Sequence, residues 1–311
     1  MTHAWIATGR QADPIELAEV ADPAPAADEA VVDVAAYSVN RGEVLLLSGA
    51  YGRAAAPGWR PGQDIAGAVT RAADDGGGPA AGTRVVAHPE GGGWTERVTV
   101  PVSKLAVLPD AVPDVVAAAL PLAGLTALRL VRAAGNLTGR SILLTGASGG
   151  VGHYLTDLAV ASGAGVTAVT ASAERGARLA ELGAAVVHDV ADAAGPFDLL
   201  FESVGGKTFG AATAKLAPGG TVLWYGQASL EPPVLDFFAM MPVTPVTIRH
   251  FAHWVSPTTD GTDLATLVRL TQDGLLHPEI GAVRDWSGTP GMLAALDQRQ
   301  IRGNAILTVG R

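Results

Sequence analysis

The most regular pattern of apolar and polar positions along the chain begins at residue 141. Ile142, Leu143 and Leu144 form an uninterrupted apolar run, which is typical of a parallel strand buried on both faces. Positions that can pack on a sheet then recur at three- and four-residue steps through 151–162, which predicts an amphipathic helix. A second apolar run at 165–170 predicts another strand. The order strand, turn, helix, strand indicates a βαβ unit.

Glycines fill the turn between the first strand and the helix, with the spacing Gly-x-x-Gly-x-x-Gly. Only glycine lets backbone N–H groups close on a pyrophosphate, and a helix N-terminus adds partial positive charge. A glycine triplet alone also fits any tight strand-to-helix turn, but the flanking strands and helix supply the context that a dinucleotide motif requires. The predicted cofactor-binding residues in this turn, called the dinucleotide cradle below, are Gly146, Ser148, Gly149, Gly150, Val151 and Gly152.

The end of the next strand indicates which dinucleotide binds. NAD enzymes usually place an acidic residue there to hold the ribose 2′-hydroxyl, but this chain offers Ser172 and Arg175. A hydroxyl and a guanidinium suit a 2′-phosphate, so NADPH/NADP+ is the predicted cofactor. Alternatively, Ser172 caps a helix that begins near Glu174, and Arg175 is merely solvated; capping and phosphate binding are compatible at Ser172.

The rest of the chain shows two different patterns of predicted secondary structure. Short β-prone runs separated by Pro, Gly and Asp predict an antiparallel, barrel-like unit in the first third. Helices alternating with strands between 115 and about 247 predict a doubly wound parallel sheet. Two helical patterns and a strand at 305–309 close the chain, and that isolated strand should return to the barrel. The short runs are 30–37, 65–71, 83–87 and 94–100, and the closing helices are 263–273 and 290–298.

Composition excludes several classes of protein. The chain has 311 residues, of which 48% are hydrophobic and 16% charged, so disorder is not expected. A net charge of −9 and no basic stripe argue against nucleic acid. No apolar stretch reaches the roughly 20 residues of a spanning helix, and no signal peptide is visible. No membrane partner is therefore expected. The absence of cysteine excludes thiolate catalysis and fits a cytoplasmic protein.

Several short motifs, in this order and spacing, resemble the medium-chain dehydrogenase/reductase superfamily, specifically a zinc-free member close to its quinone oxidoreductase and enoyl reductase branch. The resemblance covers almost the whole length. The motifs are VNRGE at 39–43, SGAY at 48–51, PGQDIAG at 61–67, GGWTE at 92–96, LPLAGLTA at 120–127, the dinucleotide cradle, GA at 183–184, LAPGG at 216–220, GLL at 274–276 and GNA at 303–305.

The resemblance implies an α/β protein of two domains with the active site in the cleft between them. A GroES-like β-barrel domain would span 1–118 and be completed by 256–311, and a Rossmann domain would span 119–255. It also implies a homodimer, in which the strand at 243–249 pairs with its twofold mate; Val246 and Ile248 are the expected contacts.

Where zinc-dependent relatives hold their catalytic metal, this chain carries Asn40, Gln63 and Leu122. Two amides and an alkyl group cannot hold Zn²⁺, so a metal-free site is expected. Without a Lewis acid, reduction of a simple ketone loses its main stabilisation, whereas conjugate reduction of an enone spreads charge into an enolate that hydrogen-bond donors can hold.

Asn40 and Tyr51 match the family's active-site Asn and Tyr and are the predicted catalytic residues. Asn40 would donate from its amide; Tyr51 would be a polar lid, an oxyanion donor or a proton donor. Alternatively, Asn40 is a buried amide that organises its loop, and Tyr51 is a surface ring in a turn. His88, before Pro89, could also donate a proton, although an exposed loop position is expected for it.

Further positions are assigned by the resemblance. Thr126 would approach the nicotinamide ribose, or else be an ordinary helix hydroxyl. Gly226 and Gln227 should border the cofactor. The expected walls of a pocket for a small hydrophobic substrate are His250, Phe251 and Trp254.

The favoured function is an NADPH-dependent, zinc-independent reductase of activated alkenes or quinones. The alternatives are a non-redox cyclase or isomerase on the same scaffold and a regulatory NADPH-binding protein.

Overall fold

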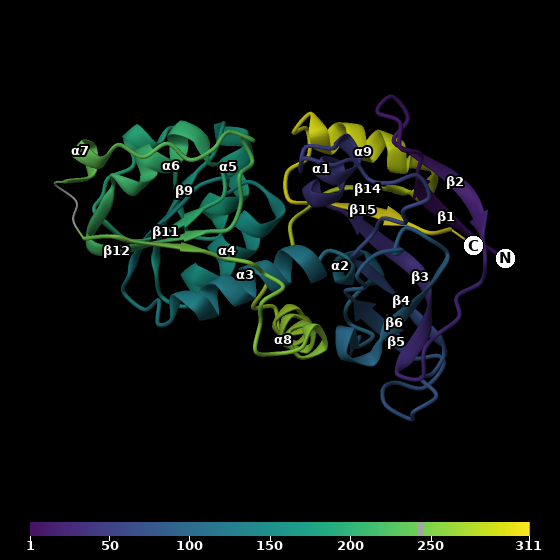
Figure 1. The fold of residues 1–311 in the computed structure, drawn as a ribbon. Helices are drawn as coiled ribbons and strands as arrows, with labels where there is room; N and C mark the ends of the chain where they lie inside the picture. Colours follow the sequence, from purple (N-terminus) through teal and green to yellow (C-terminus); the bar gives the residue numbers. More distant parts are fainter. Residues whose placement is uncertain (242–244, 311) are drawn as a thin grey trace. The chain divides into compact units, whose positions relative to one another are not determined.

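The computed structural model describes residues 1–241 and 245–310 and divides the chain into two compact units (Figure 1). Unit 1 comprises Met1–Leu125 together with Pro257–Arg311, and unit 2 comprises Thr126–Ser256. Val243, at the start of the expected dimer strand, lies outside the described residues. Among the residues that are described, every helix is too short or too polar to cross a bilayer.

Unit 2 is built on a six-stranded parallel sheet with the order β10-β9-β8-β11-β12-β13. The two strands of the predicted βαβ unit, β8 and β9, are neighbours, with Leu143 opposite Thr167. The sheet is therefore doubly wound, as predicted. Its strands are β8 Ser141–Leu144, β9 Gly165–Val169, β10 Ala185–Val187, β11 Phe197–Glu202, β12 Leu216–Trp224 and β13 Thr247–His250.

Helices cover the unit 2 sheet because their apolar faces bury against its apolar strands (Figure 1). Phe197, Leu200 and Phe209 are at the centre of the core on one face. The predicted helix at 151–162 is confirmed as α4. The elements are α3 Pro121–Ala134, which contains the boundary between the units, α4 Gly150–Ala161, α5 Ala173–Glu181, η2 Val190–Asp192, α6 Gly206–Thr213 and α7 Phe237–Met240.

Unit 1 is built on a seven-stranded, mostly antiparallel sheet with the order β14-β15-β3-β4-β5-β7, and β6 also pairs with β3. Eight of the eleven residues of the long strand β3 are buried, as expected for a strand inside the sheet that pairs with β4, β6 and β15. The strands are β3 Glu29–Val39, β4 Ile65–Arg71, β5 Arg84–Ala87, β6 Arg97–Pro101, β7 Leu105–Val107, β14 Ile280–Asp285 and β15 Asn304–Thr308.

The closing strand does return to this unit. In β15, Ala305 pairs with Val39 and Leu307 with Tyr37, antiparallel to β3. Its other neighbour, β14, was not predicted: four of its six residues are exposed, so it carries little apolar signal. The remaining elements of unit 1 are the hairpin β1 Thr2–Ala7 and β2 Ile15–Val20, α1 Arg41–Ser48, η1 Val102–Lys104, α2 Asp114–Ala117, α8 Asp260–Gln272, η4 Trp286–Gly288 and α9 Thr289–Asp297.

Candidate functional site

The dinucleotide cradle lies where β8 ends and α4 begins. Gly149 is the N-cap of α4 in an extended conformation and has no side chain to cap the helix. The first N–H groups of a helix have no partner inside it, so those of the first turn of α4 are oriented to receive an anion. The pyrophosphate of a dinucleotide is such an anion, and the cradle in unit 2 therefore fits a dinucleotide.

The geometry of the cradle requires glycine at two positions. Gly146 has a φ of +63°, and a Cβ there would lie 2.6 Å from the Ser203 hydroxyl oxygen. A Cβ on Gly152 would overlap the backbone carbonyl of Ala147. These two glycines let the loop approach β11 and let α4 begin directly against the turn.

Ser148, Ser172 and Arg175 lie together beside the cradle. The Arg175 Nε donates to the Ser148 hydroxyl at 3.0 Å. The Ser172 hydroxyl accepts from the Arg175 backbone N–H at 3.4 Å and caps α5, as the alternative expected, but the Arg175 side chain is not merely solvated because it contacts Ser148. The arrangement joins a guanidinium and two hydroxyls at the position where an adenosine 2′-phosphate would be recognised.

The carboxyl end of β11 contains a residue that the sequence reasoning missed. Glu202 is fully buried and accepts from the Thr145 hydroxyl at 3.2 Å and from the N–H groups of Val204 and Gly205 at 2.9 and 3.0 Å. Burial raises the pKa of this carboxyl. Glu202 thus ties the loop after β11 to Thr145, directly before the cradle.

The predicted residues Gly226 and Gln227 lie against that same loop. A Cβ on Gly226 would be 3.1 Å from Ser203, and the Gln227 side chain fills the space over Gly205. Both therefore belong to the carboxyl edge of the parallel sheet, where open α/β sheets bind ligands.

Thr126, the residue predicted to approach the nicotinamide ribose, lies on α3 and is 6% exposed.

In unit 1, Asp64 is the centre of a buried polar cluster. This carboxylate is 1% exposed and accepts from the Ser38 hydroxyl at 2.6 Å, the Asn40 amide at 2.7 Å and the Leu122 N–H at 2.9 Å. The His88 Nδ1 lies 3.2 Å from Asp64 Oδ1, the oxygen that also accepts from Leu122, and 2.8 Å from the Gln63 carbonyl. The expectation that His88 is an exposed loop residue is wrong: it is 7% exposed because it closes this cluster. No local pattern signals a contact with Gln63, which is distant in sequence.

Asn40 lies at the N-cap of α1, where it forms a capping box with Glu43. Its amide nitrogen donates to both the Ser38 hydroxyl, at 3.0 Å, and Asp64. An amide has two hydrogens to donate, and both are engaged here. This geometry favours the alternative in which Asn40 organises its loop.

Asn40, Gln63 and Leu122, at the positions where zinc-dependent relatives hold their metal, do not fit Zn²⁺. The Asn40 amide is engaged by Ser38 and Asp64, Gln63 uses its backbone carbonyl on His88, and Leu122 has only an alkyl side chain. Across 1–241 and 245–310, His, Cys, Asp and Glu side chains form no cluster of three that could hold a metal ion. The donor set lacks the His and thiolate ligands that zinc prefers.

Tyr51 lies in the turn after α1, and 61% of it is exposed. Its hydroxyl lies over the first turn of α1, 3.9 Å from the place that a Cβ on Gly42 would take. Desolvation raises the pKa of Tyr51, and the Arg41 guanidinium offsets part of the rise. The phenol therefore carries its proton at neutral pH and can donate it.

Burial of the Glu43 carboxyl should make the free energy of unfolding depend on pH. It is 3% exposed, its Oε1 has no hydrogen-bond partner in the described part of the chain, and burial beside Asp64 raises its pKa from 4.5 to about 8. Between these two pH values the folded protein holds a proton that the unfolded chain has released, so the free energy of unfolding should fall as pH rises, by at most about 1.4 kcal/mol per unit.

Glu43→Gln should remove most of this fall, which urea unfolding at a series of pH values would measure. Glu19→Gln, on the exposed side of β2, is the control and should keep the wild-type profile. A Glu43→Gln protein with an unchanged profile would assign the proton to another group.

The three predicted pocket residues lie at the end of β13, the last strand of unit 2, and directly after it. His250 ends β13 and contacts the Trp224 ring edge to face at 5.8 Å, and the Phe251 N–H donates to the Trp224 carbonyl at 2.8 Å. Trp254 is 72% exposed and packs on His253. His250 and Phe251 are thus held at the carboxyl end of β12, while the Trp254 ring faces solvent on unit 2 itself.

Two family descriptions match the chain. "Alcohol dehydrogenase GroES-like domain" matches residues 26–110, in unit 1, and "Zinc-binding dehydrogenase" matches residues 150–269, which begin at the last residues of the cradle and extend past the end of unit 2. The second description names a metal for which this chain lacks the ligands at Asn40, Gln63 and Leu122.

Individual relatives agree with these matches. An acryloyl-coenzyme A reductase of Sulfurisphaera tokodaii is 26% identical over 298 residues, 85% of this chain and 87% of that protein. A quinone oxidoreductase of Mus musculus is 34% identical over 163 residues, 52% of this chain and 49% of that protein. The mycobacterial protein Rv1454c, solved in complex with NADPH, is 25% identical with a TM-score of 0.87, over 99% of this chain and 100% of that one. The chain belongs to the medium-chain dehydrogenase/reductase superfamily, in its quinone oxidoreductase-like branch.

Proposed function

We propose that this protein is an NADPH-dependent oxidoreductase that reduces an activated carbon–carbon double bond or a quinone without a metal ion. The observation that carries the proposal is the dinucleotide cradle with Arg175 hydrogen-bonded to Ser148 beside it. The relatives support it, because one is named a quinone oxidoreductase, one an acryloyl-coenzyme A reductase, and one was solved with NADPH.

The protein's own residues would bind and orient the reactants. Bound NADPH supplies the hydride. The cradle and Arg175 hold its phosphates, while Gly226, Gln227 and Thr126 border the nicotinamide end. His250 and Phe251, at the carboxyl end of β12, would contact an apolar substrate such as a hydrophobic enone or quinone, and Trp254 would contribute its exposed ring only if the substrate reaches it.

Proton delivery falls to Tyr51 in this proposal. After hydride reaches the β-carbon of an enone, the enolate oxygen needs a donor and the α-carbon needs a proton. The Tyr51 phenol is exposed and protonated, so it can serve either need. Asn40 acts with Asp64 to fix the start of α1, and so positions the segment that leads to Tyr51.

Consumption of NADPH tests the reaction. Purified protein should oxidise NADPH, seen as loss of nicotinamide absorbance, in stoichiometric amounts with an enone, an enoyl thioester or a quinone. The same panel with NADH, and with saturated analogues of each substrate, provides controls. NADPH binding without oxidation across the panel would favour a cyclase, an isomerase or a regulatory NADPH-binding protein instead.

Tyr51→Phe should lower kcat about 10²-fold, because it removes one donor of general acid catalysis and leaves the ring in place. The Kd for NADPH should change little, since the groups proposed to hold its phosphates are the cradle and Arg175, not the Tyr51 phenol. Stopped-flow measurement of nicotinamide oxidation separates the two quantities. Unchanged turnover with bound NADPH would remove Tyr51 from the mechanism.

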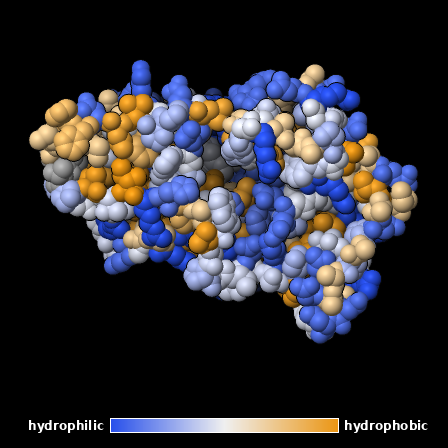
Figure 2. Space-filling model, in the orientation of Figure 1, coloured by the Kyte–Doolittle hydropathy of each residue, from blue (hydrophilic) through white to orange (hydrophobic). Residues whose placement is uncertain are grey.

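We also propose that the protein is a homodimer. The outer edge of β13 is unpaired within the described part of the sheet, and all four of its residues are exposed. Apolar side chains gather on the α7 end of unit 2 (Figure 2). Such a surface, next to an open sheet edge, fits a second copy of the same strand. The exposed apolar residues are Leu230, Val234, Leu235, Phe237, Phe238, Met241 and Ile248.

A further inference from the structure

A cavity of about 590 Å³ lies on the β1–β2 side of unit 1, and its lining residues all belong to that unit. The lining is mostly polar; Trp59 and Pro23 add apolar surface, and Thr99 contributes a hydroxyl. Arg60 is the cation among the lining residues. None of these residues belongs to the site described above.

Arg60 is held rigidly at this cavity but lacks a counter-charge. Its backbone carbonyl accepts from the Gly92 N–H at 2.9 Å, and the Trp59 carbonyl accepts from the Ala7 N–H at 2.7 Å, so the loop is fixed to its neighbours. The Arg60 Nε is buried with no hydrogen-bond partner, and the guanidinium forms no ion pair within residues 1–241 and 245–310. Burial lowers the pKa of Arg60. A half-buried cation without a partner is costly, and an anion would offset that cost.

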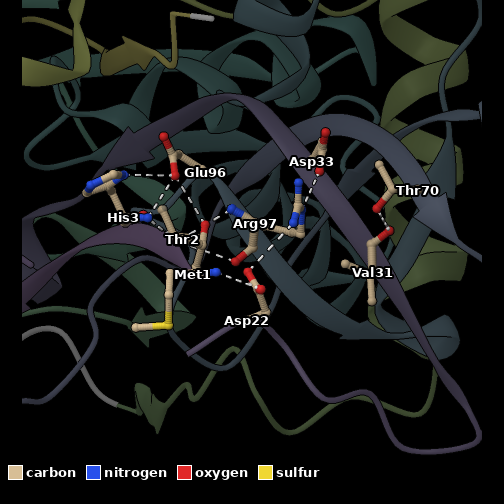
Figure 3. Close-up of polar contacts among 10 residues, drawn as sticks. Met1, Thr2, His3, Asp22, Val31, Asp33, Thr70, Glu96 and Arg97 are labelled. Carbon is tan, nitrogen blue, oxygen red and sulfur yellow. Dashed lines mark hydrogen bonds and ion pairs between the residues drawn. The ribbon is translucent and has the colours of Figure 1, made fainter. Parts of the chain in front are cut away.

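Asp22, the acidic residue among those that line the cavity, is already paired with other cations. Asp22 contacts the N-terminal ammonium at 2.7 Å and lies 3.7 Å from an Arg97 nitrogen, and Arg97 in turn donates to Asp33 at 2.8 Å (Figure 3). Glu96 in the same view accepts from the His3 backbone N–H. These carboxylates have partners of their own, so the charge of Arg60 remains available to a ligand.

We propose that this cavity binds a small organic oxyanion, a carboxylate or a phosphate ester, on the Arg60 guanidinium. A guanidinium presents parallel N–H groups that match two oxygens of either anion. The Thr99 hydroxyl provides a further polar contact, and Trp59 and Pro23 offer apolar surface to the body of the ligand. The volume is in the range of ligand pockets, roughly 300 to 1,000 Å³.

Calorimetric titration of the full chain, saturated with NADP+ so that the cradle is occupied, tests the proposal. Benzoate and phenyl phosphate are the two probes, with chloride at equal ionic strength as the blank. At least one probe should bind, and the tighter of the two identifies the head group. Arg60→Met should weaken that binding at least tenfold. Arg71→Met, which removes an exposed arginine paired with Asp74, is the matched control and should leave it unchanged.

The melting temperature provides a second test of anion binding at Arg60. Without anion, Arg60→Met should melt at or above the wild-type temperature, since it removes an uncompensated charge; with the bound probe, only wild-type protein should gain stability. The proposal is overturned if neither probe binds above the chloride blank, if Arg60→Met binds it equally well, or if Arg60→Met is destabilised while the probe stabilises both proteins alike.

Discussion

Arg175→Ala is expected to weaken NADPH binding about a hundredfold and to leave NADH binding nearly unchanged. The extra phosphate of NADPH would be held by charge-assisted hydrogen bonds from this guanidinium, and such bonds are about twice as strong as neutral ones. NADH has no phosphate at that position, so removal of the guanidinium breaks no hydrogen bond to it. Fluorescence titration of the reduced nicotinamide with both nucleotides would measure the change in preference.

Arg178→Ala is the matched control for this substitution. Arg178 lies one turn further along α5 and pairs with Glu181 at 2.8 Å, so its loss should leave the preference for NADPH intact. Equal weakening of NADPH and NADH by Arg175→Ala would show that Arg175 supports the fold through Ser148 instead of reading the 2′-phosphate.

Gly152→Ala is expected to reduce affinity for both nucleotides by more than a hundredfold. The added Cβ would overlap the Ala147 carbonyl, so the start of α4 must move away from the turn and the N–H groups of its first turn lose their alignment. The free energy of unfolding should also fall, by about 1 to 3 kcal/mol, because backbone cannot yield as a flexible side chain does.

Gly165→Ala is the control for Gly152→Ala. Gly165 begins β9 in the same unit, and a Cβ there would meet only the Arg140 carbonyl, at an ordinary distance of 3.9 Å. Nucleotide affinity should be unchanged. If Gly152→Ala bound NADPH as wild type does, the cradle would have to hold the nucleotide in some other way.

The parts of the fold that could be predicted are those with a local, repeating signal. The apolar run at 142–144 and the helix that follows it can each be recognised within a dozen residues, because a buried strand and an amphipathic helix have their own periods. β14 and the β1–β2 hairpin lacked such a signal. Half the positions of β2 are exposed, so its place in the fold depends on its neighbour β1.

The residues of the candidate site also fall into those that the local sequence predicts and those that it does not. The cradle could be predicted because its glycines are adjacent in sequence, whereas the buried cluster around Asp64 could not. That carboxylate collects donors from Ser38, His88 and Leu122, which are 26, 24 and 58 residues away. Burial of His88 and the proton on Glu43 follow from these distant contacts, and no periodicity in the sequence encodes them.

The insertion of β15 between β14 and β3 has a consequence for biosynthesis. A ribosome delivers every residue of unit 2 before it delivers the strand that completes the sheet of unit 1. During translation β3 therefore keeps an open edge until β15 has been made, and unit 2 can fold while unit 1 still lacks that strand.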